Sequence, residues 1–297
     1  MLKAVKVRLY PTNEQKLAIS SQIGGARYVY NRALALRKYA YTKFGIKVGK
    51  FALINHIKKL KSRESTAWLK ESDSQAIQQS IANMDKAYQH FFKGGGYPKF
   101  KSRHHSRQSY QYPQRVKIEG NKVYLPKIGW AKMKGWREEF QGKIKTVTVS
   151  YEAYQYHASI LVDIENNTLK PCNNAGKSIG LDVGVSLVVA DSDGNKIKPL
   201  TLTKELSKLR LRAKHLSRKK KGSSNRAKAK AKLAKANLKI ANKRKDFLHK
   251  LSLQYAESQG IVVIEDLKIK NMTKSAKGTK ETPGKQVKQK QGLNRSI

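Results

Sequence analysis

The chain has 297 residues, 39% of them hydrophobic, so it is long enough for two or three domains with buried cores and too apolar for wholesale disorder. It carries 63 Lys and Arg against 20 Asp and Glu, a formal net charge of +43; this predicts a polyanionic partner, and its spread over the whole chain favours nucleic acid over a membrane. The single cysteine, Cys172, excludes an internal disulfide and a zinc site built on paired cysteines. The sequence shows no transmembrane run and no signal peptide, so we expect a soluble, cytoplasmic protein.

The N-terminal part predicts one strand followed by helices. Residues 3–10 alternate basic and apolar side chains, which is typical of a strand, and Thr12 with Gln15 forms a capping box for the helix that follows. Further helices are expected at about 50–60 and 74–93. The apolar residues expected to face the core are Phe51, Leu53, Ile54, Ile57 and Leu60 in the first of these and, spaced 4-3-4-3, Ile77, Ile81, Met84, Tyr88 and Phe91 in the second. The first helix should bury a stripe of Leu17, Ile23, Ala26, Tyr30 and Ala33.

The next region predicts a small antiparallel β domain. A hairpin turn at Glu119-Gly120-Asn121 separates two short apolar runs, and a second pair of strands is expected at 143–151 and 154–165. We expect strand 3–10 to join this β domain, so that the helical block is inserted into it.

The turn-rich segment 166–177 predicts a domain boundary, followed by short β segments at 178–184, 186–191 and 196–202. A helical block at about 203–259, broken at 222–225, then leads to a strand at 261–265. The segment 268–297 is polar and basic, and we expect loop or disorder there.

Two carboxylates end apolar strands in this second part: Asp182 follows Ile179-Gly180-Leu181, and Glu265 follows Ile261–Ile264. Three strands, a helical excursion and a further strand begin a ribonuclease-H-like fold, in which both acids would meet in one cleft and hold Mg²⁺. Gly180 and Gly184 suit a crowded site. The alternative is a pair of ordinary strand-end acids facing solvent.

Basic residues are densest between Lys204 and Lys250, with 19 Lys and Arg against two acids. Like charges this close repel unless a polyanion screens them, which favours a nucleic-acid surface over a merely solvated one. Leu233, Ile240, Phe247 and Leu251 supply an apolar side for packing. The candidate nucleic-acid-binding residues here are Arg218, Lys219, Lys220, Lys221, Arg226, Lys228, Lys230 and Lys232.

A second basic segment, at 97–112, mixes cations with aromatic residues. The tyrosines and Phe100 there either stack on unpaired bases or pack within the protein. The candidate binding residues are Lys99, Lys101, Arg103 and Arg107, together with Arg27 on the first helix.

These segments jointly resemble the TnpB/OrfB proteins of bacterial insertion sequences, relatives of the type V CRISPR effectors. The resemblance implies RNA-guided, Mg²⁺-dependent DNA cleavage, with a guide RNA and a target DNA as partners. The matching segments are KVRLYPT (6–12), ARYVYN (26–31), YPKFKSR (97–103), IGLDVG (179–184), VIEDL (263–267) and the tail from Lys270 onwards.

The resemblance implies an α+β architecture of three parts. A wedge-like antiparallel β-barrel at 1–12 and 95–168 would carry a helical recognition domain at 13–94. An incomplete RNase-H-like (RuvC) domain would follow at 169–297, with the basic helical block 203–259 and a flexible tail at 268–297.

The resemblance also assigns roles to the two acids: Asp182 matches the first catalytic Asp and Glu265 the catalytic Glu. The family's third catalytic Asp and its four-cysteine zinc ribbon have no counterpart here, since only Asp266 and Glu281 are acidic after Glu265. No zinc site is expected, and the chain is interpreted as C-terminally truncated. It is then either an endonuclease with an incomplete site or a non-cleaving RNA- and DNA-binding remnant. The acid-tipped strands argue against a generic basic RNA-binding protein.

Overall fold

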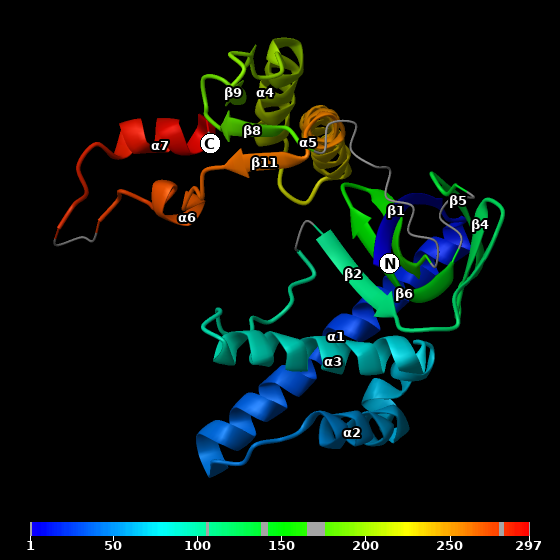
Figure 1. The fold of residues 1–297 in the computed structure, drawn as a ribbon. Helices are drawn as coiled ribbons and strands as arrows, with labels where there is room; N and C mark the ends of the chain where they lie inside the picture. Colours follow the sequence, from blue (N-terminus) through cyan, green and yellow to red (C-terminus); the bar gives the residue numbers. More distant parts are fainter. Residues whose placement is uncertain (1, 105–106, 138–141, 165–175, 279–281, 297) are drawn as a thin grey trace. The chain divides into compact units, whose positions relative to one another are not determined.

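The computed structural model describes residues 2–104, 107–137, 142–164, 176–278 and 282–296. It divides into two compact units, Met1–Thr168 and Leu169–Ile297 (Figure 1). The predicted turn-rich segment 166–177, including Cys172, lies largely outside the described residues.

Unit 1 contains a seven-stranded antiparallel sheet in the order β2-β6-β7-β1-β5-β4-β3. The N-terminal strand β1 lies between β7 and β5, pairing Val7 with Ala158 and Leu9 with Met133, so its predicted membership of the β domain is confirmed. The strands are β1 (Leu2–Tyr10), β2 (Arg107–Tyr112), β3 (Lys117–Glu119), β4 (Lys122–Leu125), β5 (Gly129–Lys134), β6 (Lys143–Glu152) and β7 (Gln155–Asp163).

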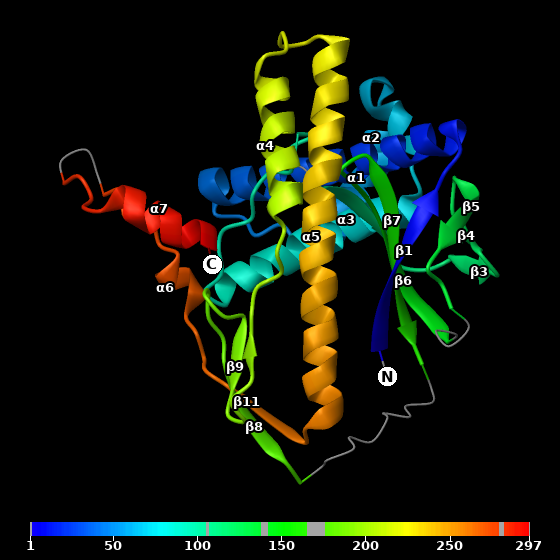
Figure 2. The same cartoon turned by 90° about the horizontal axis from the view of Figure 1, so that it is seen from above.

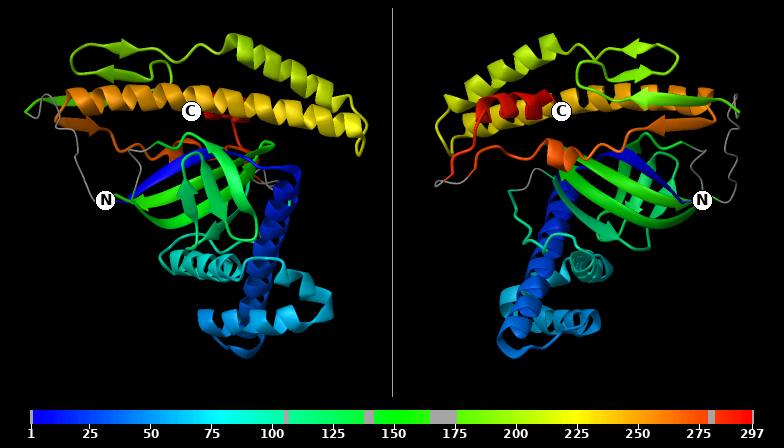
Figure 3. Two further views of the ribbon diagram at one scale, coloured as in Figure 1. Left: turned by 90° about the vertical axis from the view of Figure 1, so that its right-hand side faces the viewer. Right: turned by 60° about the vertical axis from the view of Figure 1, so that its left-hand side comes forward.

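The sheet of unit 1 curls without closing among the described residues. Its hydrogen-bonded order ends at β2 on one side and β3 on the other, so the expected closed barrel is not formed by strand pairing. The curl is visible in Figure 3, and the buried Tyr112 hydroxyl of edge strand β2 donates to the Pro126 carbonyl, beyond β4, at 2.8 Å. Because successive side chains of a strand point to opposite faces, every second residue points into this curve, and those residues are mostly apolar. The fully buried members include Val7, Leu9, Val147, Val149, Ala158, Ile160 and Val162.

Helices inserted between β1 and β2 form a second core. They are α1 (Asn13–Phe44), α2 (Lys50–Ser62), the 3-10 helix η1 (Glu64–Lys70) and α3 (Ser74–Phe92). The capping box is confirmed, because the Thr12 Oγ1 accepts from the Gln15 N–H and the Gln15 Oε1 accepts from the Thr12 N–H. Ile77, Ile81, Met84 and Tyr88 of α3 are buried as predicted.

Two predicted core positions in these helices are wrong. Leu17 and Phe51 are each 74% exposed. Each lies two residues before a buried position, Ile19 or Leu53, and two residues rotate a helix by about 200°, onto the opposite face.

Unit 2 contains a four-stranded sheet in the order β10-β9-β8-β11, made of β8 (Ser178–Asp182), β9 (Val189–Asp191), β10 (Lys196–Ile197) and β11 (Ile261–Ile264). The helices α4 (Thr203–Ser217) and α5 (Ser224–Ser258) form a long hairpin between β10 and β11 (Figure 2). The predicted strand, helical block and returning strand are therefore present. The expectation of loop or disorder at 268–297 is wrong in part, since α6 (Ile269–Met272) and α7 (Val287–Ser296) form there. Within the described residues, no helix is long and apolar enough to cross a membrane.

Two adjacent glycines of α1 provide a matched test of packing. A Cβ on Gly25 would lie 2.4 Å from the Ser72 Oγ and 3.2 Å from its Cβ, whereas a Cβ on Gly24 meets nothing within 4 Å. The neighbouring Gln22 fixes this approach, because its Oε1 accepts from the Asp73 N–H at 2.9 Å. Gly25 therefore lets α1 lie against the turn that precedes α3.

We expect Gly24→Ala to raise the free energy of unfolding by about 0.5–1 kcal/mol, since alanine is the better helix former. Gly25→Ala should lower it by about 1–3 kcal/mol through overpacking against Ser72. Urea titration of both variants measures the difference, and equal shifts of the same sign would show that the close approach is unimportant.

Candidate active site and nucleic-acid interface

The two strand-end carboxylates lie on neighbouring parallel strands. β8 and β11 pair in the register Ile179↔Val262 to Leu181↔Ile264. Extending this register by one residue puts Asp182, the last residue of β8, opposite Glu265. Adjacent strands lie about 4.8 Å apart, and both side chains are exposed. The sequence-based expectation that the two acids meet at one strand end therefore agrees with the observed pairing.

Burial identifies the face of the sheet on which these acids lie. Ile179 and Leu181 pack against α5, in a cluster with Leu251 and Tyr255. Alternation then puts Gly180 and Asp182 on the other face. On this face Val263, the register partner of Gly180, is 58% exposed, and Ile264 on the α5 side is 62% exposed, so the described residues cover neither face of β11.

A tyrosine of α5 ties the helix to the sheet beside this site. The Tyr255 hydroxyl donates to the Asp191 Oδ2 at 2.9 Å, and Asp191 pairs with Leu181 across β8 and β9. Burial, together with the acceptor Asp191, raises the pKa of Tyr255 to about 12. Desolvation alone would raise the pKa of Asp191, but hydrogen bonds from Asn195 and Tyr255 outweigh it and lower that pKa. At neutral pH Tyr255 therefore stays neutral and donates the hydrogen bond, and Asp191 stays charged and accepts it.

The donor set at the strand ends suits a hard cation. Asp182 and Glu265 offer carboxylate oxygens, which Mg²⁺ prefers while it keeps several waters. In the part of the chain that the structure describes, no group of three or more His, Cys, Asp or Glu side chains gathers to hold a metal. The site fits Mg²⁺ through two protein ligands.

The two glycines of the motif differ in how closely the protein approaches them, so the expected crowding is present at Gly184 only. A Cβ on Gly180 would come no closer than 3.9 Å to the Ser192 Cβ, so the backbone there is not crowded by protein. A Cβ on Gly184 would lie 3.2 Å from the Leu187 carbonyl oxygen, so this glycine serves the tight loop after β8.

In unit 1, the basic side chains predicted from 99–107 gather beside α1. Asn31 fixes the segment, because its amide donates to the Lys101 carbonyl at 2.9 Å and accepts from the Lys101 N–H at 2.8 Å. The Lys101 ammonium then lies 4.1 Å from the centre of the Tyr30 ring, and desolvation lowers its pKa. Lys99 is exposed on the same segment.

Arg27 lies at two adjoining cavities of unit 1. Its Nη1 donates to the Gln108 Oε1 at 3.0 Å. Burial, followed by the nearby charge of Arg103, lowers its pKa. One cavity, of about 450 Å³, also includes Arg103, Tyr151 and Tyr156, and the smaller one, of about 150 Å³, includes Lys101 and Arg107. Four of the five predicted unit 1 cations thus line one basic, aromatic hollow.

Sequence reasoning missed several members of this interface. Gln108 lies on β2, a strand that was not predicted because its polar residues hide the alternation. Tyr110 and Tyr112, considered as possible stacking platforms, are instead buried, and their hydroxyls lie 3.3 Å apart.

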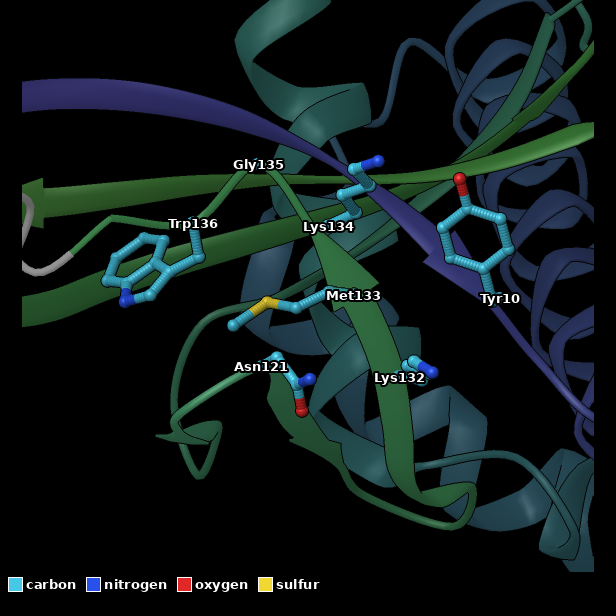
Figure 4. Close-up of a pocket in the computed structure, with 7 residues that line it drawn as sticks. All are labelled: Tyr10, Asn121, Lys132, Met133, Lys134, Gly135 and Trp136. Carbon is cyan, nitrogen blue, oxygen red and sulfur yellow. The ribbon is translucent and has the colours of Figure 1, made fainter.

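A further cavity, of about 600 Å³, opens along β5 (Figure 4). Tyr10 of β1 and Lys132 and Lys134 of β5 line it, with Trp136 beyond the strand end. Lys132 and Lys134 are exposed, so this wall also presents positive charge. The spacing of the two lysines in a strand could have indicated it.

The helical hairpin of unit 2 presents most of its predicted cations to solvent. No residue of α4 is buried, and α5 buries only Ala236, Ile240, Leu251 and Tyr255. The exposed candidates are Arg218, Lys219, Lys220, Lys221, Lys228, Lys230 and Lys232. Arg226 differs: its Nη1 donates to the carbonyls of Leu216 at 2.9 Å and Lys219 at 2.8 Å, so it caps the end of α4.

Two family models match the chain. One, described as a probable transposase (OrfB of the IS605 type), matches residues 159–276, and one described as a helix-turn-helix domain of that family matches residues 1–46. In the structure, residues 2–44 form β1 and the long helix α1, and the described part of this segment contains no second helix.

Two of the similar curated proteins cover most or all of the chain, and a third covers about a third of it. It is 38% identical over 303 residues to the putative RNA-guided DNA endonuclease InsQ of Escherichia coli K12, covering 100% of this chain and 74% of InsQ. It is 34% identical over 281 residues to a putative RNA-guided DNA endonuclease of Streptomyces pristinaespiralis, covering 93% and 69%. Virulence protein VsdF of Salmonella dublin is 35% identical over 114 residues, covering 35% of this chain and 96% of VsdF. A cryo-EM structure of a Cas12f1–sgRNA–target DNA complex aligns with a TM-score of 0.49 at 13% identity, covering 99% of this chain and 86% of that one.

These matches place the chain in the class of probable transposases encoded by insertion sequences. The chain belongs to the TnpB/OrfB family.

Lys220→Gln and Arg226→Gln remove one charge each from the same hairpin, and we expect different results. Lys220→Gln should weaken binding of a nucleic-acid duplex and reduce the slope of log K against log salt by about 0.9, without lowering stability. Arg226→Gln should lower the free energy of unfolding by roughly 1–2 kcal/mol, because the carbonyls of Leu216 and Lys219 lose a charged donor. Salt-dependent binding and hydrogen exchange in the last turn of α4 measure the two effects. Identical behaviour of the variants would contradict the division of roles.

Proposed function

We propose that this protein is an RNA-guided DNA endonuclease whose cutting site is formed by Asp182 and Glu265. The observation that carries the proposal is the parallel register of β8 with β11, which aligns both exposed acids at one strand end. The InsQ and Streptomyces relatives, which carry the same activity in their names, support it. In this proposal unit 2 is a RuvC-like nuclease domain, and unit 1 is a wedge-like β domain with an inserted helical recognition domain.

In the proposed site, Asp182 and Glu265 hold Mg²⁺ through their carboxylate oxygens. Bound Mg²⁺ would activate water and neutralise charge on the leaving oxygen of a phosphodiester. The open face over Gly180 leaves room for a DNA strand beside the acids. The hydrogen bond from Tyr255 to Asp191 keeps α5 and β9 together, which holds β8, and hence Asp182, in position.

The proposed partners are a guide RNA and a target DNA, and the proposed location is the cytoplasm. The charge of +43 requires a polyanion, and the exposed lysines of the α4–α5 hairpin suit a duplex held through its phosphates. The hollow with Arg27, Arg103, Tyr151 and Tyr156 combines cations with aromatic rings, which suits unpaired nucleotides.

A second candidate is a protein of this family that binds RNA and DNA but does not cut. One observation favours it: no third acid accompanies Asp182 and Glu265 among the described residues, although the family resemblance implies three. Two carboxylates hold a hard divalent cation more weakly than three, so cutting would need a high Mg²⁺ concentration or would not occur.

We expect the purified protein with its guide RNA and Mg²⁺ to nick matched DNA, and Asp182→Ala or Glu265→Gln to reduce the rate by at least a hundredfold. The physical reason is the loss of a metal-holding oxygen, and removing Mg²⁺ with EDTA should have the same effect. A gel assay of labelled target DNA measures the rate.

Asp246→Asn is the matched control, because Asp246 is an exposed acid of the same unit that pairs with Lys250 at 2.8 Å and lies on α5 rather than on β8 or after β11. This variant should cut normally. Tight, salt-sensitive binding with no cleavage at any Mg²⁺ concentration would favour the second candidate. Full activity in Asp182→Ala would overturn the assignment of the site.

A further inference from the structure

The inserted helices carry an aromatic cavity that neither the proposed cutting site nor the basic hollow uses. It measures about 760 Å³ and lies between the C-terminal parts of α1 and α3 and the segments that follow them. Tyr41, Tyr88, Phe92 and Tyr97 contribute rings to it. A volume of this size accommodates a nucleotide-sized ligand.

The inner rings of the cavity are held rigidly. The hydroxyls of Tyr88 and Tyr97 lie 2.9 Å apart, and their rings meet edge to face with centroids 5.6 Å apart. Phe91 contacts Tyr97 in the same way at 5.3 Å. The Arg37 guanidinium lies 4.3 Å from the centre of the Tyr88 ring and is fixed there by Asp85 at 2.7 Å. A ligand therefore finds a wall that is already formed.

The outer rings are exposed. Phe92 is 73% exposed and Tyr41 is 60% exposed, although both border the cavity. Exposed aromatic faces beside a preformed wall suit a flat, apolar ring that can stack on them.

The positive charge of the lining residues indicates that the ligand also carries a negative group. Arg37, Lys38 and Lys47 line it, and its described lining contains no carboxylate. A ligand that joins a flat ring to a negative charge satisfies both features, and a nucleotide has this chemistry. Arg37 is already paired with Asp85, but a second protein with an apolar surface would offer no negative charge to Lys38 and Lys47.

We infer that this cavity binds one unpaired nucleotide of the guide RNA, with the base stacked on Phe92 and Tyr41 and the phosphate beside Lys38 and Lys47. RNA is favoured over duplex DNA because folded RNA presents unstacked bases in bulges and loops, whereas bases in duplex DNA are already paired and stacked. This inference rests on the proposed function, since it names a subsite for the proposed guide.

The test uses an RNA hairpin with one bulged 2-aminopurine, whose fluorescence is quenched when the base stacks. The full chain should bind it at least fivefold more tightly than the same hairpin without the bulge, with quenching, at a salt concentration that screens phosphate contacts. Phe92→Ala should abolish both the preference and the quenching.

Phe51→Ala is the matched control, because Phe51 is 74% exposed against 73% for Phe92 and lies outside the cavity. It should keep the preference. Tyr97→Phe keeps the ring while removing the hydroxyl, so it should also keep quenching. Circular dichroism of each variant verifies the helices.

The outcomes are distinct from those of the cleavage assay, because binding is measured without Mg²⁺. No preference for the bulged hairpin, or equal losses in Phe92→Ala and Phe51→Ala, overturns the inference even if the protein cuts DNA. A preference for a bulged DNA hairpin over the RNA one overturns the assignment to guide RNA. A Phe92-dependent RNA preference in a protein that never cuts supports this site and contradicts only the proposed cleavage.

Discussion

Unit 2 depends on one constraint, the parallel pairing of β8 with β11. Parallel neighbours cannot be joined by a tight turn, so the chain must cross over between them. Here β9, β10 and the α4–α5 hairpin make that connection, and α5 returns to the sheet through Leu251 and Tyr255. The same pairing aligns Asp182 with Glu265 and obliges the chain to carry a long basic hairpin between them. The candidate cutting site and the candidate binding surface thus follow from a single strand pairing.

Unit 1 depends in the same way on the position of β1. A strand from the N-terminus lies between β7 and β5, so the chain must leave the sheet after Tyr10 and return at β2. The helices α1 to α3 occupy that excursion. Because α1 begins directly after β1, with the Gln15 side chain donating to the Trp130 carbonyl of β5 at 2.9 Å, it carries Arg27 and Asn31 to the basic segment at 99–107. The hollow beside α1 is a consequence of where β1 is inserted.

The spacing of apolar residues, together with the capping and strand-end residues, made much of the fold predictable. The 4-3-4-3 spacing of α3, the capping box at Thr12 and the acid-tipped strands each express a local rule, and each is present in the structure. β2 was not predictable, because four of the six residues of Arg107–Tyr112 are polar and the burial of Tyr110 and Tyr112 is decided by β6 and α3. The role of Arg226 also escaped prediction, since a cap on carbonyls ten and seven residues earlier leaves no pattern in a run of basic residues. The cavity at Phe92 joins residues from α1 and α3 that no spacing connects.

The excess of cations lowers the stability of the folded protein when no polyanion is bound. With 63 cations and 20 acids, most cations have no acid available, and those with structural uses, such as Arg226, Arg37 and Arg115, are exceptions. A bound polyanion removes repulsion that the folded chain alone must bear, so binding and folding are linked by mass action. The helical hairpin illustrates this most directly, because α4 buries no residue and its cations face solvent. If the hairpin binds nucleic acid as proposed, its stability is expected to depend on that partner, so the proposed guide RNA would also stabilise the fold.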